Sequence, residues 1–113
     1  MRLEVNKYLY DIESAAALLV QFTAGKQFTD YAANAMLRAA VEREFEIIGE
    51  ALAQLAKLDE NVAAQIREYR RIIAFRNILI HGYANVDDRL VWDVVETKLP
   101  VLCREVAQLL ARP

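Results

Sequence analysis

The sequence has few of the residues that interrupt helices. It contains only three glycines and two prolines among 113 residues, while 56% of its residues are hydrophobic. Sheet proteins need turn-forming residues at short intervals, so this composition favours helices joined by short connections. A chain of this length forms one domain, residues 1–113, because a second core would be too small to be stable. We therefore expect an all-α domain with one functional site.

What the sequence lacks also excludes several kinds of site. Cys103 is the only cysteine, which rules out an intramolecular disulfide and a cysteine-based zinc site. With one histidine and no glycine-rich phosphate loop, the sequence supports neither a paired-histidine metal site nor P-loop chemistry. No apolar run approaches about 18 residues, and residues 1–14 lack a basic region followed by an apolar signal core. We expect a cytoplasmic protein that needs no cofactor.

The charge balance is slightly negative, with a formal net charge of −2 at pH 7. A surface of this kind does not attract nucleic acid over its whole area, so an anionic substrate needs a local basic patch. The segment IREYRRIIAFRN is one candidate, because it places Arg67, Arg70, Arg71 and Arg76 within ten residues. The high apolar content further predicts that part of the surface is covered by a second copy in a homodimer.

Hydrophobic spacing predicts an antiparallel bundle of four or five helices. Apolar residues recur at intervals of three and four along the segments concerned, and potential capping residues stand at their ends. Pro100 is expected to kink the last segment or to stand in the first turn of a new helix. The predicted helices cover residues 5–23, 29–58, about 62–81 with an irregularity between 66 and 69, 88–98, and a fifth segment after Pro100. In the segment 88–98, we expect Leu90, Val91, Val94 and Val95 to face inward, with Trp92 at the margin.

Two features of the predicted helix 29–58 need an explanation. Gly49 lies in its interior, where glycine costs about 1 kcal/mol relative to alanine, and close approach of another helix would account for it. Glu42, Glu46 and Glu50 follow one another at four-residue spacing along one ridge. Like charges at that spacing repel, so the ridge is either solvated or paired with arginines from elsewhere in the chain.

The segment RNILIHGY, residues 76–83, contains side chains that suit phosphodiester chemistry. An imidazole such as His81 exchanges protons near pH 7, and a guanidinium such as Arg76 stabilises negative charge on a phosphate. RNA carries its own nucleophile, the 2′-hydroxyl, so these groups suffice for a metal-free ribonuclease. An ordinary helix end is the alternative interpretation, since a cationic residue followed by glycine is a common helix ending.

The spacing within this segment sets a geometric condition. In a continuous helix, Arg76 and His81 lie about 140° apart, whereas Asn77 and His81 are neighbours on one face. Arg76 and His81 could meet around a substrate if Gly82 unwound the end of the helix. They could also meet if two copies of the segment faced each other across a dimer axis.

The sequence resembles the HepT-like family of HEPN-domain proteins. The resemblance covers nearly the whole chain and is carried by RNILIHGY, by EFEIIGEAL before it and by VDDRLVWDVVETKLPVL after it. The family is marked by an arginine, four residues, a histidine, one residue and a tyrosine, here Arg76, His81 and Tyr83. It implies a HEPN helical bundle, a homodimer with both motifs near its axis, and a metal-independent endoribonuclease that is the toxin of a toxin–antitoxin pair.

The resemblance also implies a role for each motif residue. Arg76 and His81 would form the ribonuclease site, and Asn77 would orient Arg76 or the phosphate. Tyr83 would be the hydroxyl that an MntA-type nucleotidyltransferase antitoxin modifies with AMP. The segment LDENVAAQIREYRRIIAF departs from the usual family pattern before the motif, and it adds an arginine cluster. The further RNA-binding residues that we expect in this cluster are Arg67, Arg70 and Arg71.

Two other functions compete with the ribonuclease hypothesis. The same surface could bind a nucleotide or dock the nucleotidyltransferase without cleaving RNA, because resemblance of fold does not establish activity. The chain could also be a purely structural helical dimer. In that case, substitutions of Arg76 and His81 would change stability alone.

Overall fold

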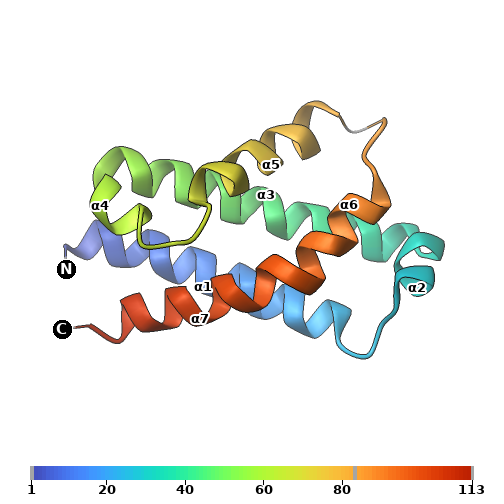
Figure 1. Ribbon diagram of the computed structural model, residues 1–113, viewed down its shortest axis with the longest axis horizontal. Helices are drawn as coiled ribbons and strands as arrows, with labels where there is room; N and C mark the ends of the chain where they lie inside the picture. The colour runs from blue at the N-terminus through green and yellow to red at the C-terminus, as the bar shows by residue number, and fades with distance from the viewer. Residues whose placement is uncertain (1, 83, 113) are drawn as a thin grey trace.

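The residues that the computed structural model describes, 2–82 and 84–112, form helices and turns and contain no strand. The long helices run alternately up and down, and the two ends of the chain lie at the same end of the molecule (Figure 1). The helices are α1 (Leu3–Thr23), α2 (Phe28–Ala33), α3 (Ala35–Leu58), α4 (Glu60–Ala63), α5 (Tyr69–His81), α6 (Asp88–Asp93), the π-helix η1 (Val94–Lys98) and α7 (Leu99–Leu110). The predicted all-α antiparallel bundle is confirmed. No helix in this part of the chain is long and apolar enough to cross a membrane.

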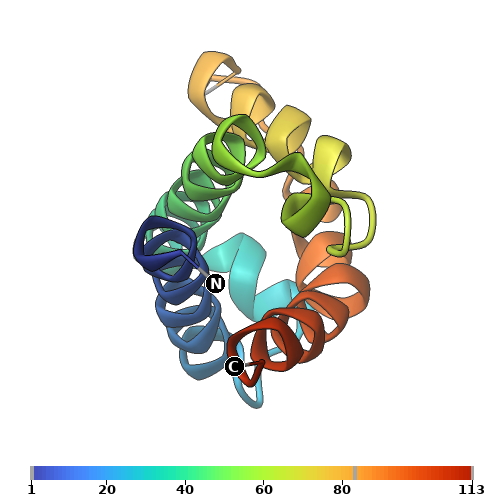
Figure 2. The ribbon, with the colours of Figure 1, turned by 90° about the vertical axis from the view of Figure 1, so that its left-hand side faces the viewer.

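The core lies between α1, α3 and the run formed by α6, η1 and α7. Viewed along the bundle, α1 stands between α3 and α7, while α5 packs on the far side of α3 (Figure 2). Apolar side chains at three- and four-residue spacing explain this arrangement, because each long helix turns one stripe toward its neighbours. Fully buried members of these stripes are Leu9, Ile12, Leu19, Val41, Ile48, Leu52, Leu55 and Leu79. The helix α5 is therefore held mainly by α3, and its other flanks remain open.

The predicted helix 29–58 is wrong in one respect, because the chain breaks it at Asn34. The backbone of Asn34 is extended, with φ −122° and ψ 101°, and its side-chain oxygen accepts a hydrogen bond from Leu37 N at 3.1 Å. The cause is a tertiary contact: Tyr31 of α2 is fully buried, and its ring centroid lies 5.3 Å from that of Trp92 on α6. Burial of Tyr31 turns α2 away from the axis of α3, and Asn34 caps the new helix.

The connection between α3 and α5 confirms the predicted irregularity between residues 66 and 69. Asp59 ends α3 and caps α4, accepting a hydrogen bond from Val62 N at 3.3 Å. No helix covers residues 64–68, and Glu68 has a left-handed backbone with φ 59°. A non-glycine residue in that conformation is uncommon and needs support from its surroundings. Here the support is an ion pair, since Glu68 Oε2 lies 2.7 Å from Lys98 Nζ.

The C-terminal segments form one continuous run, with Pro100 in the first turn of α7. A proline removes one backbone donor and clashes with the carbonyl four residues before it, so the wider π-turn of η1 just before it relieves the clash. Val91 and Val95 are buried as predicted, and Val94 is half-buried. Two predictions in this segment are wrong. Leu90 is 40% exposed because it faces the gap beside α5, and Trp92 is only 4% exposed because it packs on Tyr31.

Candidate functional site

Residues 76–81 of the RNILIHGY segment form the second half of α5, and Gly82 caps the end of the helix. The helix is continuous through His81, and Gly82 N donates to the carbonyl oxygen of Ile78 at 2.8 Å. A Cβ atom at Gly82 would stand 2.7 Å from that same oxygen, so glycine allows this tight ending. The helix end that the sequence predicts is confirmed. Tyr83, the predicted AMP acceptor, lies outside the described residues.

The side chain of Arg76 lies against α3. Its Nη2 is 2.7 Å from Glu50 Oε2, and its Nη1 donates to Asn77 Oδ1 at 3.1 Å. The side chain is 27% exposed, and its Nε atom is buried with no hydrogen-bond partner among the described residues. A guanidinium held in this way is a fixed positive group with N–H donors to spare, which is the form that binds a phosphate.

Gly49 explains how Arg76 comes so close to α3. A Cβ atom at Gly49 would stand 2.3 Å from the Cβ of Arg76 and 2.9 Å from its Cγ, so the two helices touch only because the glycine has no side chain. The predicted reason for Gly49, close approach of another helix, is confirmed. The sequence marks Gly49 and Glu50 only as a glycine in a helix interior and one end of a glutamate ridge. It does not identify Arg76 as the residue that packs on both.

Two of the three glutamates of the α3 ridge are paired with arginines. Glu50 is paired with Arg76, and Glu46 Oε1 lies 3.6 Å from Arg43 Nη1. Glu42, at the other end of the ridge, is half-buried without an ion pair among the described residues. Burial raises the pKa of the Glu42 carboxyl, and the nearby carboxylates of Asp88 and Glu46 raise it further.

His81 lies on a different face of α5 from Arg76. His81, Asn77 and Arg70 are all exposed and follow at spacings that bring them to one outward side of the helix. Because the helix is continuous, the direction from its axis to Arg76 differs from that to His81 by about 140°. Gly82 does not unwind the end of the helix before His81. Among the described residues no hydrogen bond joins Arg76 to His81, and Arg76 Nη1 instead donates to Asn77, one turn before His81.

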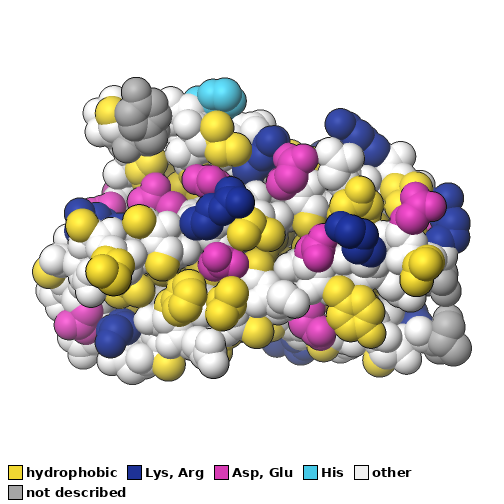
Figure 3. Space-filling model, turned by 180° about the vertical axis from the view of Figure 1, so that it is seen from behind, with side chains coloured by type: hydrophobic (Ala, Val, Ile, Leu, Met, Phe, Trp, Pro, Cys, Tyr) yellow, Lys and Arg dark blue, Asp and Glu magenta, His cyan; other side chains and the backbone are white. Residues whose placement is uncertain are grey.

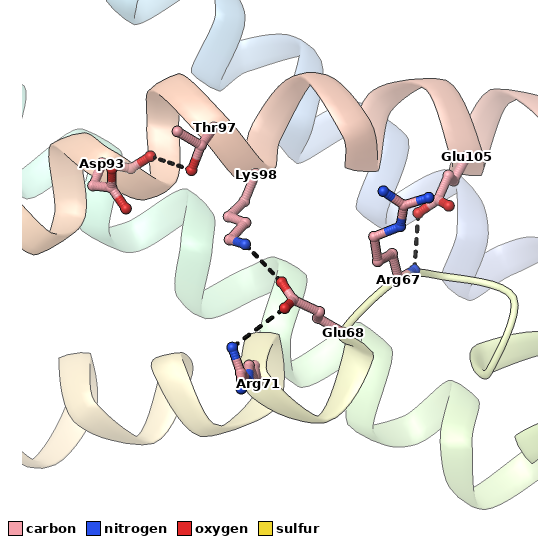
Figure 4. Close-up of polar contacts among 7 residues, drawn as sticks. All are labelled: Arg67, Glu68, Arg71, Asp93, Thr97, Lys98 and Glu105. Atoms are coloured by element: carbon pink, nitrogen blue, oxygen red, sulfur yellow. Dashed lines mark hydrogen bonds and ion pairs between the residues drawn. The ribbon is translucent and has the colours of Figure 1, made fainter.

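The arginine cluster lies at the opposite end of α5 from His81. Glu68 joins two of the basic residues there, accepting from Lys98 Nζ at 2.7 Å and from Arg71 Nη1 at 3.3 Å (Figure 4). The hydrogen bond from Lys98, together with its charge, lowers the pKa of the Glu68 carboxyl. The backbone N–H of Arg67 donates to Glu105 Oε1 at 2.8 Å. Arg71, the cluster residue nearest to His81 along α5, is ten residues and about 15 Å along the axis from it.

Two hollows flank α5. One is a cleft of about 550 Å³ between α1, α3 and α5, and its lining includes Lys7, Tyr8, Arg43, Glu50, Arg76 and Ile80. The face that α1 and α3 form carries basic and acidic side chains in alternation, with apolar patches between them (Figure 3). The other is a groove of about 480 Å³ between α5 and the α6–η1–α7 run, with Arg67 and Arg71 on its rim and Phe75 and Ile78 among its apolar residues. Arg76 therefore lines the cleft, whereas the cluster residues Arg67 and Arg71 line the groove.

The described residues offer few other reactive groups. In the ranges 2–82 and 84–112, no three side chains of His, Cys, Asp or Glu come together in a way that could hold a metal ion. Cys103 lies half-buried on α7, and burial raises the pKa of its thiol. A thiol that resists ionisation is a poor nucleophile, so Cys103 is a packing residue. The chemistry available to this chain is concentrated on α5.

A comparison with known protein families assigns most of the chain. The family model described as "Ribonuclease HepT-like" matches residues 12–109, which include all of α3, α5 and α6. The chain belongs to the ribonuclease HepT-like family. The membership confirms the resemblance that the sequence suggested, and it supports a ribonuclease type of function.

Named relatives agree with this family. The chain is 34% identical to a protein of Methanocaldococcus jannaschii named "Putative RNase MJ1380", over 91% of this chain and 94% of that protein. It is 33% identical to "Probable ribonuclease HepT" of Thermococcus cleftensis, over 90% of this chain and 92% of the relative. It is 30% identical to "Putative RNase TTE0752" of Caldanaerobacter subterraneus, over 93% of each chain. No solved structure matches the chain significantly.

Proposed function

We propose that this HepT-like protein is a metal-independent endoribonuclease that acts as the toxin of a toxin–antitoxin pair in the cytoplasm. The observation that supports this most directly is the state of Arg76, whose guanidinium is fixed by Glu50 and Asn77 yet still has N–H groups to donate. His81 stands exposed in the last turn of the same helix. RNA is the substrate class that the family description names.

The proposed reaction uses the 2′-hydroxyl of the substrate as nucleophile. A base removes the 2′-hydroxyl proton, the 2′-oxygen bonds to phosphorus, and the bond from phosphorus to the 5′-oxygen breaks. The products are a 2′,3′-cyclic phosphate and a 5′-hydroxyl, which receives a proton. His81 supplies the proton transfer, because imidazole exchanges protons near neutral pH. Arg76 stabilises the negative charge that develops on the phosphate oxygens.

We propose that the working form is a homodimer in which Arg76 and His81 come from different copies. A single chain directs the two side chains about 140° apart. Ile78, which lies within the motif, is 48% exposed, and Leu90, which lines the same groove, is 40% exposed. A second copy packed on this side would cover apolar surface and bring a second motif close to the first.

The proposed partner is an MntA-type nucleotidyltransferase antitoxin. It would transfer AMP to the hydroxyl of Tyr83, releasing pyrophosphate from ATP. Tyr83 is only two residues after His81 in the sequence. A bulky anion on the Tyr83 hydroxyl would therefore be attached close to the proposed site, and it would repel an RNA phosphate. Asn77 is proposed to orient Arg76, and Arg67, Arg70 and Arg71 are proposed to contact the RNA backbone beyond the site.

RNA cleavage by purified variants tests this function. His81→Ala and Arg76→Ala are each expected to lower the cleavage rate by about 10²-fold or more, because each removes a group that acts in the transition state. Arg104→Ala is the matched control, since it removes an exposed arginine from α7. Cleavage is expected to persist in a metal chelator. Equal cleavage by folded wild-type and His81→Ala proteins would refute the proposal.

A non-catalytic docking function is the second candidate, and the apolar groove beside α5 favours it. Its lining includes Phe45, Phe75 and Leu102, which suits a protein partner as well as a second copy. Incubation with the nucleotidyltransferase and ATP, followed by mass measurement of the peptide containing Tyr83, separates the two candidates. AMP on Tyr83, with no RNA cleavage before or after its removal, would support the docking function and reject the ribonuclease.

A further inference from the structure

The contact between α3 and α5 is tightest at Gly49. A Cβ atom there would overlap the Cβ of Arg76 at 2.3 Å and its Cγ at 2.9 Å. Both helices are continuous and regular at this point, so the short distance reflects their packing and not a bend in either backbone. The first carbons of the Arg76 side chain are consequently fixed against the backbone of α3.

Glu50 is the next residue along α3, and it fixes the other end of the same side chain. Its Oε2 lies 2.7 Å from Nη2 of Arg76, a short distance typical of charge-assisted hydrogen bonds. Asn77 accepts from Nη1 at 3.1 Å, so the guanidinium is held by one residue of α3 and one of α5. With the stem and both terminal nitrogens held, Arg76 has little rotational freedom left.

This ion pair is poorly suited to stabilising the fold. The side chain of Glu50 is 50% exposed and that of Arg76 is 27% exposed, and ion pairs so close to solvent contribute little to stability. A glycine in the middle of α3 is itself unfavourable for the helix. The chain therefore keeps an unfavourable glycine and a weak ion pair at the same place, and both act on Arg76.

We propose that Glu50 is a positioning residue, which sets the direction of the Arg76 guanidinium so that its remaining N–H groups meet the RNA phosphate. The inference rests on the proposed function of Arg76. Glu50 does not touch the reacting atoms and transfers no proton. It acts by removing, before substrate arrives, the rotamer freedom that a long arginine side chain would otherwise lose in the transition state. Gly49 is the packing requirement for this arrangement.

Steady-state cleavage of one RNA substrate gives the first test. Glu50→Ala is expected to lower kcat about tenfold with little change in KM, because a positioning effect is realised in the transition state. Glu50→Gln keeps an oxygen that can accept from Nη2, so it is expected to recover a large part of the loss. Glu46→Gln is the matched control, since it removes a carboxylate one turn away on the same ridge, and its kcat should stay within about twofold of wild type.

Nitrogen-15 relaxation of the Arg76 Nε–H group gives a second test that does not depend on RNA cleavage. The Nε atom is buried, so its proton should exchange slowly enough to be observed. The group is expected to be rigid in the wild type and in Glu46→Gln, and mobile on the picosecond-to-nanosecond timescale in Glu50→Ala. An Arg76 that stays rigid in Glu50→Ala would overturn the inference.

The two tests separate failure of this inference from failure of the proposed function. If no variant and no wild-type preparation cleaves RNA, the ribonuclease proposal fails, and the relaxation result still decides whether Glu50 holds Arg76. If the wild type cleaves RNA, and Glu50→Ala has an unchanged or higher kcat with a lower KM, then Glu50 competes with the phosphate and does not position Arg76. Loss of kcat in Glu46→Gln equal to that in Glu50→Ala would assign the effect to the charge of the cleft and would also overturn the inference.

Discussion

At the scale of single residues, the sequence predicts the nature of the contact at Gly49 but not its partner. A glycine inside a helix signals close approach, because the missing side chain is the only reason to accept its cost. Which residue approaches depends on the register between α3 and α5, and no local pattern gives that register. Arg76 is recognisable from its own motif, whereas Glu50 becomes part of the site only when the helices are placed side by side.

Glu42 provides a prediction about stability at this scale. Burial raises the pKa of its carboxyl in the folded protein, so the folded state binds a proton more readily than the unfolded state does. Stability from this group therefore falls as the pH rises through and above 4.5, the carboxyl's ordinary pKa, and at neutral pH the ionised carboxylate is a net cost. Glu42→Gln is expected to raise the free energy of unfolding at pH 7 by no more than about 0.5 kcal/mol, or roughly 2 °C in Tm, because solvent screens a carboxyl that is only partly buried.

The measurement for Glu42 is thermal unfolding at two pH values. The gain of Glu42→Gln over the wild type should be present at pH 7 and should shrink at pH 4, where the wild-type carboxyl takes up its proton. Glu44→Gln on the same helix is the control for removing one negative charge. A gain that is the same at both pH values, or that the control reproduces, would contradict the assignment to burial of Glu42.

At the scale of helices, the sequence predicts the segments that carry a regular apolar stripe. The stripes of α1 and α3 and the end of α5 follow from residues within each segment, and the structure confirms them. The break at Asn34 and the burial of Trp92 are different, because they result from one contact between α2 and α6. Tyr31 and Trp92 are far apart in sequence, so a local pattern cannot reveal that their rings meet. Tertiary contacts of this kind override local helix propensity.

Substitution of Asn34 tests whether its side chain defines the start of α3. Asn34→Ala removes the oxygen that accepts from Leu37 N, and loss of an N-cap costs about 1 kcal/mol, or roughly 4 °C in Tm. Asn34→Asp keeps an oxygen acceptor at the same place and should retain most of the stability. Thermal unfolding followed by circular dichroism measures both. Equal losses in the two variants would mean that the cap hydrogen bond does not contribute.

At the scale of the whole molecule, α5 separates the surfaces that the function needs. Arg76 opens to the cleft beside α1 and α3, His81 stands on the outward face, and the arginine cluster borders the groove beside η1. The sequence predicts the motif residues through the family resemblance, and their roles stay predictions. Their separation is a property of the folded helix and its neighbours. One chain therefore presents these groups on different surfaces, and in the proposed homodimer a second chain joins them.

Mixing two inactive variants tests whether the site is shared between copies. An Arg76→Ala chain retains His81 and a His81→Ala chain retains Arg76, so a mixed dimer contains one complete site if each site takes one residue from each copy. Random exchange makes about half of the dimers mixed, each with one of two sites intact, so RNA cleavage should return to about a quarter of the wild-type rate.

The variants are unfolded together, refolded and assayed, and the double variant Arg76→Ala/His81→Ala mixed with wild type is the control. In that control, each of the two sites in a mixed dimer lacks either Arg76 or His81. Exchange of chains therefore restores no activity. If the two single variants form mixed dimers, shown by mass, and still cleave no RNA above either variant alone, then both groups act from the same chain and the shared site is refuted.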